Sequence, residues 1–172
     1  MSMSEIRLYP DPILRQKSLP LEIIDSKAKE MIDDMARTMY LYKGIGLAAS
    51  QIGILLRAIV VNSEYGLMQM INPEILESEG ENAGEEGCLS LPDVEVNVTR
   101  GSKILIRGID LDEKEMEFEA SGLLARIFQH EIDHLEGKLI IDNLSKLKRD
   151  LIKSRLKKRG RMLNSDKTSC LV

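Results

Sequence analysis

The two histidines of this chain fall within one five-residue segment, His130-Glu131-Ile132-Asp133-His134. On a helix, residues four positions apart share one face, so both imidazoles can bind the same metal ion. The glutamate directly after the first histidine lies close enough to serve as a general base without being a ligand. Two ordinary helix histidines are the alternative interpretation, but the spacing and the intervening glutamate favour a metal centre.

Two imidazoles do not complete a tetrahedral metal site, so a third protein ligand is expected, with the fourth position left to water in a catalytic site. Cys88 is the only cysteine in the body of the chain, because Cys170 is the third residue from its end. A thiolate binds zinc and ferrous iron well. We predict a site formed by Cys88, His130 and His134; the alternative for Cys88 is a small buried apolar residue.

Length and composition indicate a globular protein: 172 residues, 43% apolar and 30% charged, are enough to bury a core without disulfides. Two cysteines far apart in the sequence are typical of a reducing compartment, so a cytoplasmic location is expected. No apolar segment approaches the roughly twenty residues that span a bilayer, and the N-terminus lacks a signal-peptide core. Membrane and secreted disulfide-rich proteins are therefore not expected.

The charge is distributed unevenly along the chain. Residues 1–143 contain 14 Lys and Arg against 26 Asp and Glu, a net charge of −12, whereas residues 144–172 contain 10 against 2, a net charge of +8. We predict a single catalytic domain over 1–143, followed by a basic C-terminal helix and flexible tail over 144–172. Leucines and isoleucines at helical spacing suggest that this helix ends near Gly160.

Hydrophobic periodicity predicts two helices in the body of the chain. A cap at residues 25–26 begins the first, whose apolar face covers residues 28–39 and which ends near Gly44. Ser121 caps the second, which carries the two histidines and is closed by Gly137. The remaining positions of the second helix are mostly apolar, so it should be buried on most sides.

Strands are predicted between these helices. An apolar segment at 55–61 is followed by a second at 68–73, which should end at its proline. Alternating apolar residues predict further strands at 94–98, 104–106 and 116–118. Because strands and helices do not alternate regularly, we expect an α+β fold, with small antiparallel or mixed sheets packed around the histidine-bearing helix and a C-terminal helix added.

Three segments resemble, in order, the three signature motifs of peptide deformylases: 44–51 (GIGLAASQ), 86–90 (EGCLS) and 129–134 (QHEIDH). The similarity extends more loosely over about residues 5–145 and fades in the basic tail. It implies an α+β metallohydrolase that removes the formyl group from the N-terminal formyl-methionine of new polypeptides and releases formate.

The resemblance also implies catalytic roles. A divalent ion lowers the pKa of a bound water from about 16 toward neutrality and so supplies hydroxide. Glu131 is expected to take the water proton and then deliver it to the departing amine. By similarity, the side-chain amide of Gln51 and the backbone N–H of Leu89 stabilise the charge that develops on the formyl oxygen.

Substrate-binding residues follow by analogy with the same family. Ile45 and Gly46 are expected to run beside the peptide with main-chain hydrogen bonds, since glycine allows close approach. A helix C-cap at Gly44 accounts for the glycines equally well. Ile45 and Ile127 are the expected walls of an apolar methionine pocket, and Arg126 puts a polar residue at its rim.

Cys/His₂ ligation suits one divalent ion per chain, whether iron, zinc, nickel or cobalt, and the resemblance indicates Fe²⁺ natively. The expected partners are N-formylmethionyl nascent peptides; no membrane or DNA partner is expected. The basic helix is either a solvated element laid on the body, or a ribosome-binding element that contacts RNA phosphates. The resemblance supports the second interpretation, because bacterial deformylases dock on ribosomes through a C-terminal helix.

Two other functions remain open. A zinc endopeptidase also uses H-E-x-x-H but usually takes another Glu or His downstream, and this chain has no further histidine. A metal-stabilised ribosome- or RNA-binding module without catalysis would generally need a fourth protein ligand. Release of formate from a formyl-methionyl peptide would distinguish these functions.

Overall fold

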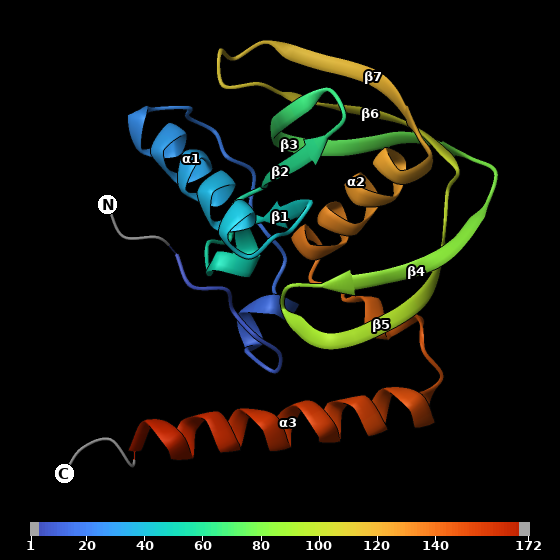
Figure 1. Ribbon diagram of the computed structural model, residues 1–172. Helices are drawn as coiled ribbons and strands as arrows, with labels where there is room; N and C mark the ends of the chain where they lie inside the picture. The colour runs from blue at the N-terminus through green and yellow to red at the C-terminus, as the bar shows by residue number, and fades with distance from the viewer. Residues whose placement is uncertain (1–3, 169–172) are drawn as a thin grey trace.

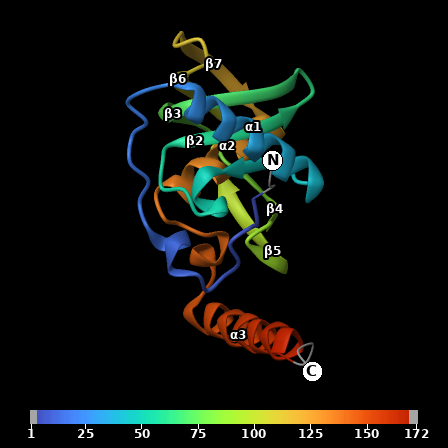
Figure 2. The same ribbon diagram turned by 90° about the vertical axis from the view of Figure 1, so that its left-hand side faces the viewer.

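The computed structural model describes residues 4–168, with side chains described through residue 158 (Figure 1). It contains a five-stranded antiparallel sheet in the order β1-β2-β3-β6-β7, a two-stranded antiparallel sheet of β4 and β5, and three α-helices. Helix α2 lies between the two sheets, and α3 lies on the side of the molecule away from the larger sheet (Figures 1 and 2). The expected α+β class is confirmed.

The elements have the following bounds. The helices are α1 (Ser26–Leu41), α2 (Gly122–Leu135) and α3 (Lys146–Thr168), with short 3-10 helices η1 (Pro12–Arg15), η2 (Ala49–Ile52) and η3 (Ile140–Asn143). The strands are β1 (Gly46–Ala48), β2 (Ala58–Ser63), β3 (Gly66–Glu79), β4 (Asn82–Cys88), β5 (Leu91–Arg100), β6 (Lys103–Ile109) and β7 (Glu115–Ser121).

Helix α1 forms where its capping residue and apolar spacing predict. The carboxylate of Asp25 accepts a hydrogen bond of 2.9 Å from the N–H of Ala28, which satisfies one of the free donors of the first turn. Its apolar face, including Ile32, Met35 and Met39, is fully buried against β1 and β2. The helix ends at Leu41, three residues before the predicted stop at Gly44.

Helix α2 is the centre of a second core cluster. Ala125, Phe128 and Leu135 are fully buried and pack with apolar residues of β2, β3 and β6. Ser121 holds the N-cap position as predicted, but its side chain makes no capping hydrogen bond. The burial of α2 on most sides gives its polar side chains the fixed surroundings that a catalytic site needs.

Strand β3 is longer than predicted, because it continues past Pro73 to Glu79. The register with β6 shifts between Ile71 and Glu74, so the proline falls at an irregularity where a ladder hydrogen bond is not required. Just before it, Asn72 has a φ of 50°, and its side chain bonds both the N–H and the carbonyl of Leu21 at 2.9 Å. The prediction that the strand ends at its proline was therefore wrong.

Helix α3 also differs from the prediction, because it passes Gly160 and ends at Thr168. Ile152 and Leu156 pack against the core cluster under η1 and η3, whereas Leu147 is 73% exposed and Leu151 is 64% exposed. The second pair is rotated by about 140° from the first around the helix, so the leucines and isoleucines at helical spacing do not form one apolar face. Cys170 and the end of the predicted tail lie outside the described residues.

None of the helices in the described part of the chain is long and apolar enough to cross a membrane.

Candidate metal centre

The predicted metal ligands come together from two elements. Cys88 ends β4, and His130 and His134 lie one turn apart on α2. The Nε2 atoms of the two histidines are 3.2 Å apart, and the Sγ of Cys88 is 3.2 Å from Nε2 of His134. The three donor atoms all lie within 4.8 Å of one another. Ligands of one tetrahedral ion are separated by roughly 3.4 to 3.6 Å, so this donor set fits a single metal ion.

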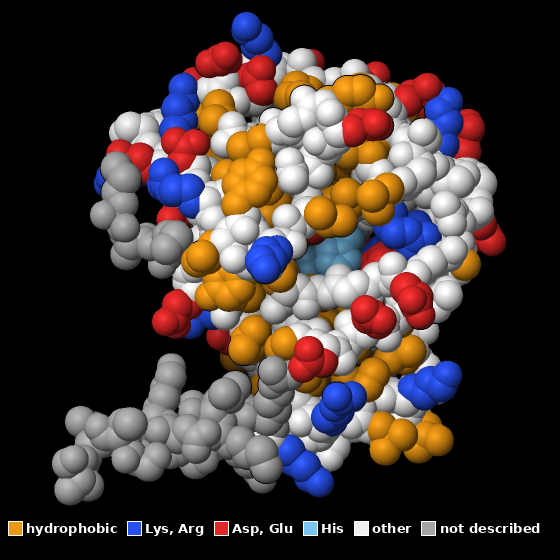
Figure 3. Space-filling view, viewed as in Figure 1, with side chains coloured by type: hydrophobic (Ala, Val, Ile, Leu, Met, Phe, Trp, Pro, Cys, Tyr) orange, Lys and Arg blue, Asp and Glu red, His pale blue; other side chains and the backbone are white. Residues whose placement is uncertain are grey.

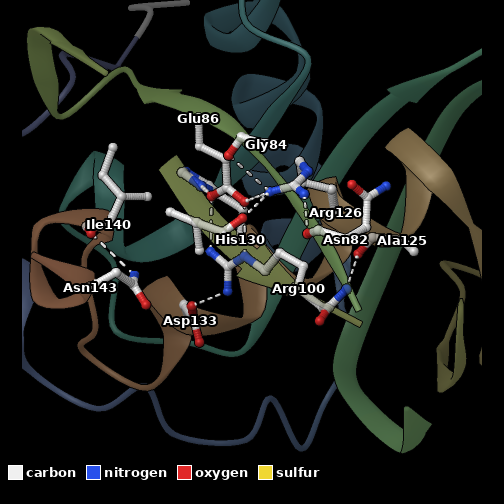
Figure 4. Close-up of polar contacts among 12 residues, drawn as sticks. Asn82, Gly84, Glu86, Arg100, Ala125, Arg126, His130, Asp133, Ile140 and Asn143 are labelled. Carbon is white, nitrogen blue, oxygen red and sulfur yellow. Dashed lines mark hydrogen bonds and ion pairs between the residues drawn. The ribbon is translucent and has the colours of Figure 1, made fainter. Parts of the chain in front are cut away.

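Glu86 orients the first histidine. Its carboxylate accepts a hydrogen bond of 2.9 Å from Nδ1 of His130, which leaves Nε2 directed toward the other donors. The carboxylate also accepts two bonds of 2.9 Å from Arg100 and one of 2.7 Å from Arg126 (Figure 4). Arg100 in turn bonds Asp133 on α2. This buried network ties β4, β5 and α2 together beside the ligands.

The network keeps Glu86 ionised. Burial raises the pKa of this carboxyl, but the hydrogen bonds from Arg100 and His130 outweigh burial and lower the pKa to about 2. Glu86 was not among the residues predicted from the sequence. One signal was available, because Glu86 is the first residue of the 86–90 segment that resembles a family motif and lies two residues before Cys88.

The two histidines differ in their surroundings. Burial acts to lower the pKa of His130, yet hydrogen bonds with Cys88 and Glu86 outweigh it and raise that pKa well above its ordinary value. Burial, followed by the charge of His130, lowers the pKa of His134 well below its ordinary value.

Glu131 is buried beside the ligands, with only 4% of its surface exposed. Its Oε2 atom has no hydrogen-bond partner among the described residues, and burial raises the pKa of this carboxyl to about 7. A Cβ atom at Gly46 would collide with the carboxylate and lie 2.9 Å from Ile127. Glycine at position 46 therefore makes room for Glu131, a reason that the sequence analysis did not anticipate.

Gln51 lies on η2 with its amide held in one orientation. Its Oε1 accepts a hydrogen bond of 2.9 Å from the N–H of Ala48. Its Nε2 lies 3.6 Å from Sγ of Cys88 and 3.2 Å from Oγ of Ser90. The amide donors thus point toward the metal ligands, and the fully buried Ser90 is a partner that the sequence analysis missed.

A cavity of about 450 Å³ opens onto these groups. Its walls include every predicted catalytic and substrate-binding residue, namely Ile45, Gly46, Gln51, Leu89, Ile127 and Glu131. Ile127 is buried, whereas Ile45 is 49% exposed and therefore belongs to the mouth of the cavity. Figure 3 shows the histidine surface at the bottom of a hollow that hydrophobic side chains border. Lys43, Glu85 and Leu123 also line the cavity and were not predicted.

Gly44 does not act as the left-handed C-cap of α1. The residue with positive φ after this helix is Lys43, at 55°, and Tyr42 is the C-cap. The N–H of Gly44 still reaches back to the carbonyl of Met39 at 2.9 Å. The alternative explanation, a helix C-cap at Gly44, is therefore wrong. Gly46 is explained instead by the close approach of its backbone to the side chain of Glu131.

Comparisons with known proteins agree with this geometry. Residues 3–150 match the family described as polypeptide deformylase. The chain is 49% identical over 164 residues to a peptide deformylase of Syntrophobacter fumaroxidans, covering 92% of this chain and 96% of the relative. It is 47% identical over 162 residues to that of Thermodesulfovibrio yellowstonii, covering 91% and 98%.

Solved structures give the same result. A peptide deformylase from Legionella pneumophila superposes with a TM-score of 0.88 at 40% identity, covering 95% of this chain and 98% of that one. A peptide deformylase from Ehrlichia chaffeensis in complex with actinonin superposes with a TM-score of 0.90 at 37% identity, covering 94% and 99%.

Proposed function

The chain belongs to the peptide deformylase family, and from that premise we propose that Cys88, His130 and His134 hold one divalent ion while Glu131 moves the proton. As a member of this family, the protein is a metal-dependent hydrolase that removes the N-formyl group from new polypeptides. One observation supports this assignment of residues. Three donor atoms are grouped beside a cavity, and a buried carboxyl oxygen of Glu131, which has no hydrogen-bond partner among the described residues, belongs to the same cavity.

When bound, the ion would act as a Lewis acid that activates water and polarises the formyl carbonyl. A thiolate and two imidazoles suit Fe²⁺, Zn²⁺, Ni²⁺ or Co²⁺. We propose Fe²⁺ as the native ion, on the resemblance of the three motifs to the family. We also propose that the enzyme works in the cytoplasm, where polypeptides are made and where the Cys88 thiol stays reduced.

Glu131 handles the proton in this proposal. Its burial keeps bulk water away, and its free Oε2 can accept a proton from the attacking water. Burial favours the protonated form of this carboxyl, so the group can hold the proton that it takes from water and deliver it to the departing amine.

Gln51 and Leu89 stabilise the charge on the formyl oxygen. The bond from Ala48 to Oε1 of Gln51 fixes which end of the amide faces the cavity, so its N–H donors are in place before the reaction begins. The backbone N–H of Leu89, next to Cys88, is the second proposed donor. Preorganised donors of this kind are worth about 3 kcal/mol each in acyl transfer.

The substrate lies along the mouth and inner wall of the cavity. We propose that Ile45 and Gly46 hold the peptide backbone and that Ile45 and Ile127 contact the methionine side chain. Both isoleucines line the cavity, which is large enough for a side chain of that size.

The test is formate release. Purified without oxygen, the protein should contain about one metal ion per chain and should release equal amounts of formate and free amine from a formyl-methionyl tripeptide. A zinc endopeptidase would instead cleave an internal peptide bond, and a metal-stabilised binding module would release nothing. Either of these outcomes, with metal content measured on the same sample, would contradict the proposal.

The chain is proposed to divide into a catalytic domain, residues 1–143, and a basic ribosome-binding extension, residues 144–172. Support comes from α3, whose exposed lysines extend over the surface while Ile152 and Leu156 pack on the body. A lysine-rich helix binds RNA through phosphate contacts, and this binding weakens as salt rises.

Deleting residues 146–172 should therefore abolish salt-sensitive cosedimentation with ribosomes and leave formate release from a free tripeptide within about twofold of the parent. Because the deletion also removes buried Leu156, a second variant keeps the helix and replaces four exposed lysines by glutamine: Lys146, Lys148, Lys157 and Lys158. Its matched control replaces four exposed lysines elsewhere: Lys27, Lys29, Lys114 and Lys138. Equal cosedimentation of the two glutamine variants would leave α3 as a packing element only.

A further inference from the structure

Arg126 lies on the face of α2 that lines the cavity, together with Leu123, Ile127 and His130. Its guanidinium is nevertheless committed to the smaller sheet. Nη2 donates to the carbonyl of Asn82 at 2.6 Å, and Nη1 donates to the carbonyl of Val98 at 2.9 Å. The side chain is only 11% exposed. The arginine predicted at the pocket rim thus directs both of its terminal nitrogens to acceptors of the smaller sheet.

Two further acceptors complete this arrangement (Figure 4). Nη1 lies 2.7 Å from Oε1 of Glu86 and 3.4 Å from the carbonyl of Gly84. A Cβ atom at Gly84 would lie 3.2 Å from both Cζ and Nη2 of Arg126, so glycine leaves the space that the guanidinium occupies. One side chain of α2 therefore bonds β4 at three residues and β5 at one.

The smaller sheet needs such an anchor. Strand β4 pairs only with β5, and a two-stranded sheet on its own is marginally stable. The residues at the end of β4, from Glu85 to Cys88, form one wall of the cavity, and α2 forms the facing wall. Two other links, Arg100 to Asp133 and Gln129 to Gly101, join α2 to the far end of β5, and His130 bonds the Glu86 side chain. Among the described residues, the side chain of Arg126 is the one that also bonds backbone carbonyls of β4, at Asn82 and Gly84.

We propose that Arg126 is a positioning residue that sets the separation of α2 and β4, and thereby the width of the pocket for the first side chain of the substrate. The proposal rests on the deformylase function given above. The guanidinium is planar and carries its N–H donors in a fixed arrangement, so it can hold several carbonyls at set positions. A side chain without this group cannot do so. Glu86 keeps its bonds to Arg100 and His130 without Arg126, so the metal ligands should stay in place.

The decisive variant is Arg126→Met, which keeps an unbranched apolar stem and removes the guanidinium. Three tripeptides that differ only in the first residue, formyl-methionyl, formyl-leucyl and formyl-phenylalanyl, report the pocket width. We expect KM for the methionyl peptide to rise about tenfold with kcat within about threefold, and preference for methionine over phenylalanine to fall about tenfold, in the range that apolar pockets achieve.

Arg57→Met is the matched control. Arg57 is 15% exposed and bonds a carboxylate, Glu136, and a backbone carbonyl, Pro73, but it does not line the cavity. Both variants lose a mostly buried cation that bonds a carboxylate and backbone carbonyl groups, so thermal unfolding should shift in the same direction in the two. Only Arg126→Met should change KM and the order of preference.

A second variant tests the proposal if Arg126→Met does not fold. Gly84→Ala keeps every charge, but its Cβ would lie 3.2 Å from the guanidinium, which must shift by a few tenths of an ångström, so KM should rise in the same direction by about threefold. Unchanged KM and preference in both variants would overturn the proposal, as would metal loss and a lower kcat with preference intact. If the parent released no formate at all, the proposed function would fail instead, before the variants were compared.

Discussion

Replacing Glu131 by alanine is expected to lower kcat for formate release by at least about 100-fold, and up to about 10⁴-fold, because a positioned general base contributes that much. The metal content should stay near that of the parent, since Glu131 is not one of the three grouped donors. The measurements are steady-state formate release and metal analysis of the same preparation.

Glu131→Gln separates proton transfer from packing, because it preserves the buried volume and removes the proton-accepting group. We expect it to be as inactive as the alanine variant. A buried carboxyl with an unpartnered oxygen is costly, so the glutamine variant should unfold at a temperature no lower than the parent. Near-parent turnover in a fully metallated alanine variant would show that another group moves the proton.

Replacing Cys88 by serine should have the other large effect. A hydroxyl is a poor ligand for the ions that a thiolate and two imidazoles select, so the variant should lose the metal or bind a different one. Loss of second-coordination partners alone typically costs 10- to 100-fold in metal affinity, so loss of a ligand should cost more than about 100-fold. Metal titration under anaerobic conditions measures this directly, with formate release falling in parallel.

Cys170→Ser is the control, because Cys88, His130 and His134 already supply the three donors of the proposed site. It should change neither metal content nor rate. A Cys88→Ser protein that binds the same ion with parent affinity would mean that the third ligand is misassigned. Serine nearly preserves the shape of cysteine, so misfolding is a poor explanation of metal loss at this position.

The elements that were predicted correctly have a regular pattern of apolar and polar residues within their own sequence. Helix α1 has a capping carboxylate and an apolar face at helical spacing, and it forms within a few residues of the predicted bounds. Strand β5 alternates buried valines with exposed polar residues, and it too was predicted. The strands that were missed, β1 and β4, lack such a pattern: β1 has three residues, and β4 buries only Glu86 of its seven.

What the sequence by itself determined is the set of donor residues proposed for the metal. The spacing of His130 and His134 put both rings on one helix face, and the shortage of other cysteines left Cys88 as the third donor. These inferences needed only helix geometry and ligand preference, which act over a few residues.

Only the tertiary structure decided how that centre is held. Glu86, Arg100 and Arg126 are separated by up to 40 residues, and nothing in their sequence spacing indicates that they share one buried network. The need for Gly46 likewise comes from Glu131, which lies on a different element. Such pairings depend on how α2 and the smaller sheet pack, and packing between distant segments leaves no periodic trace in the chain.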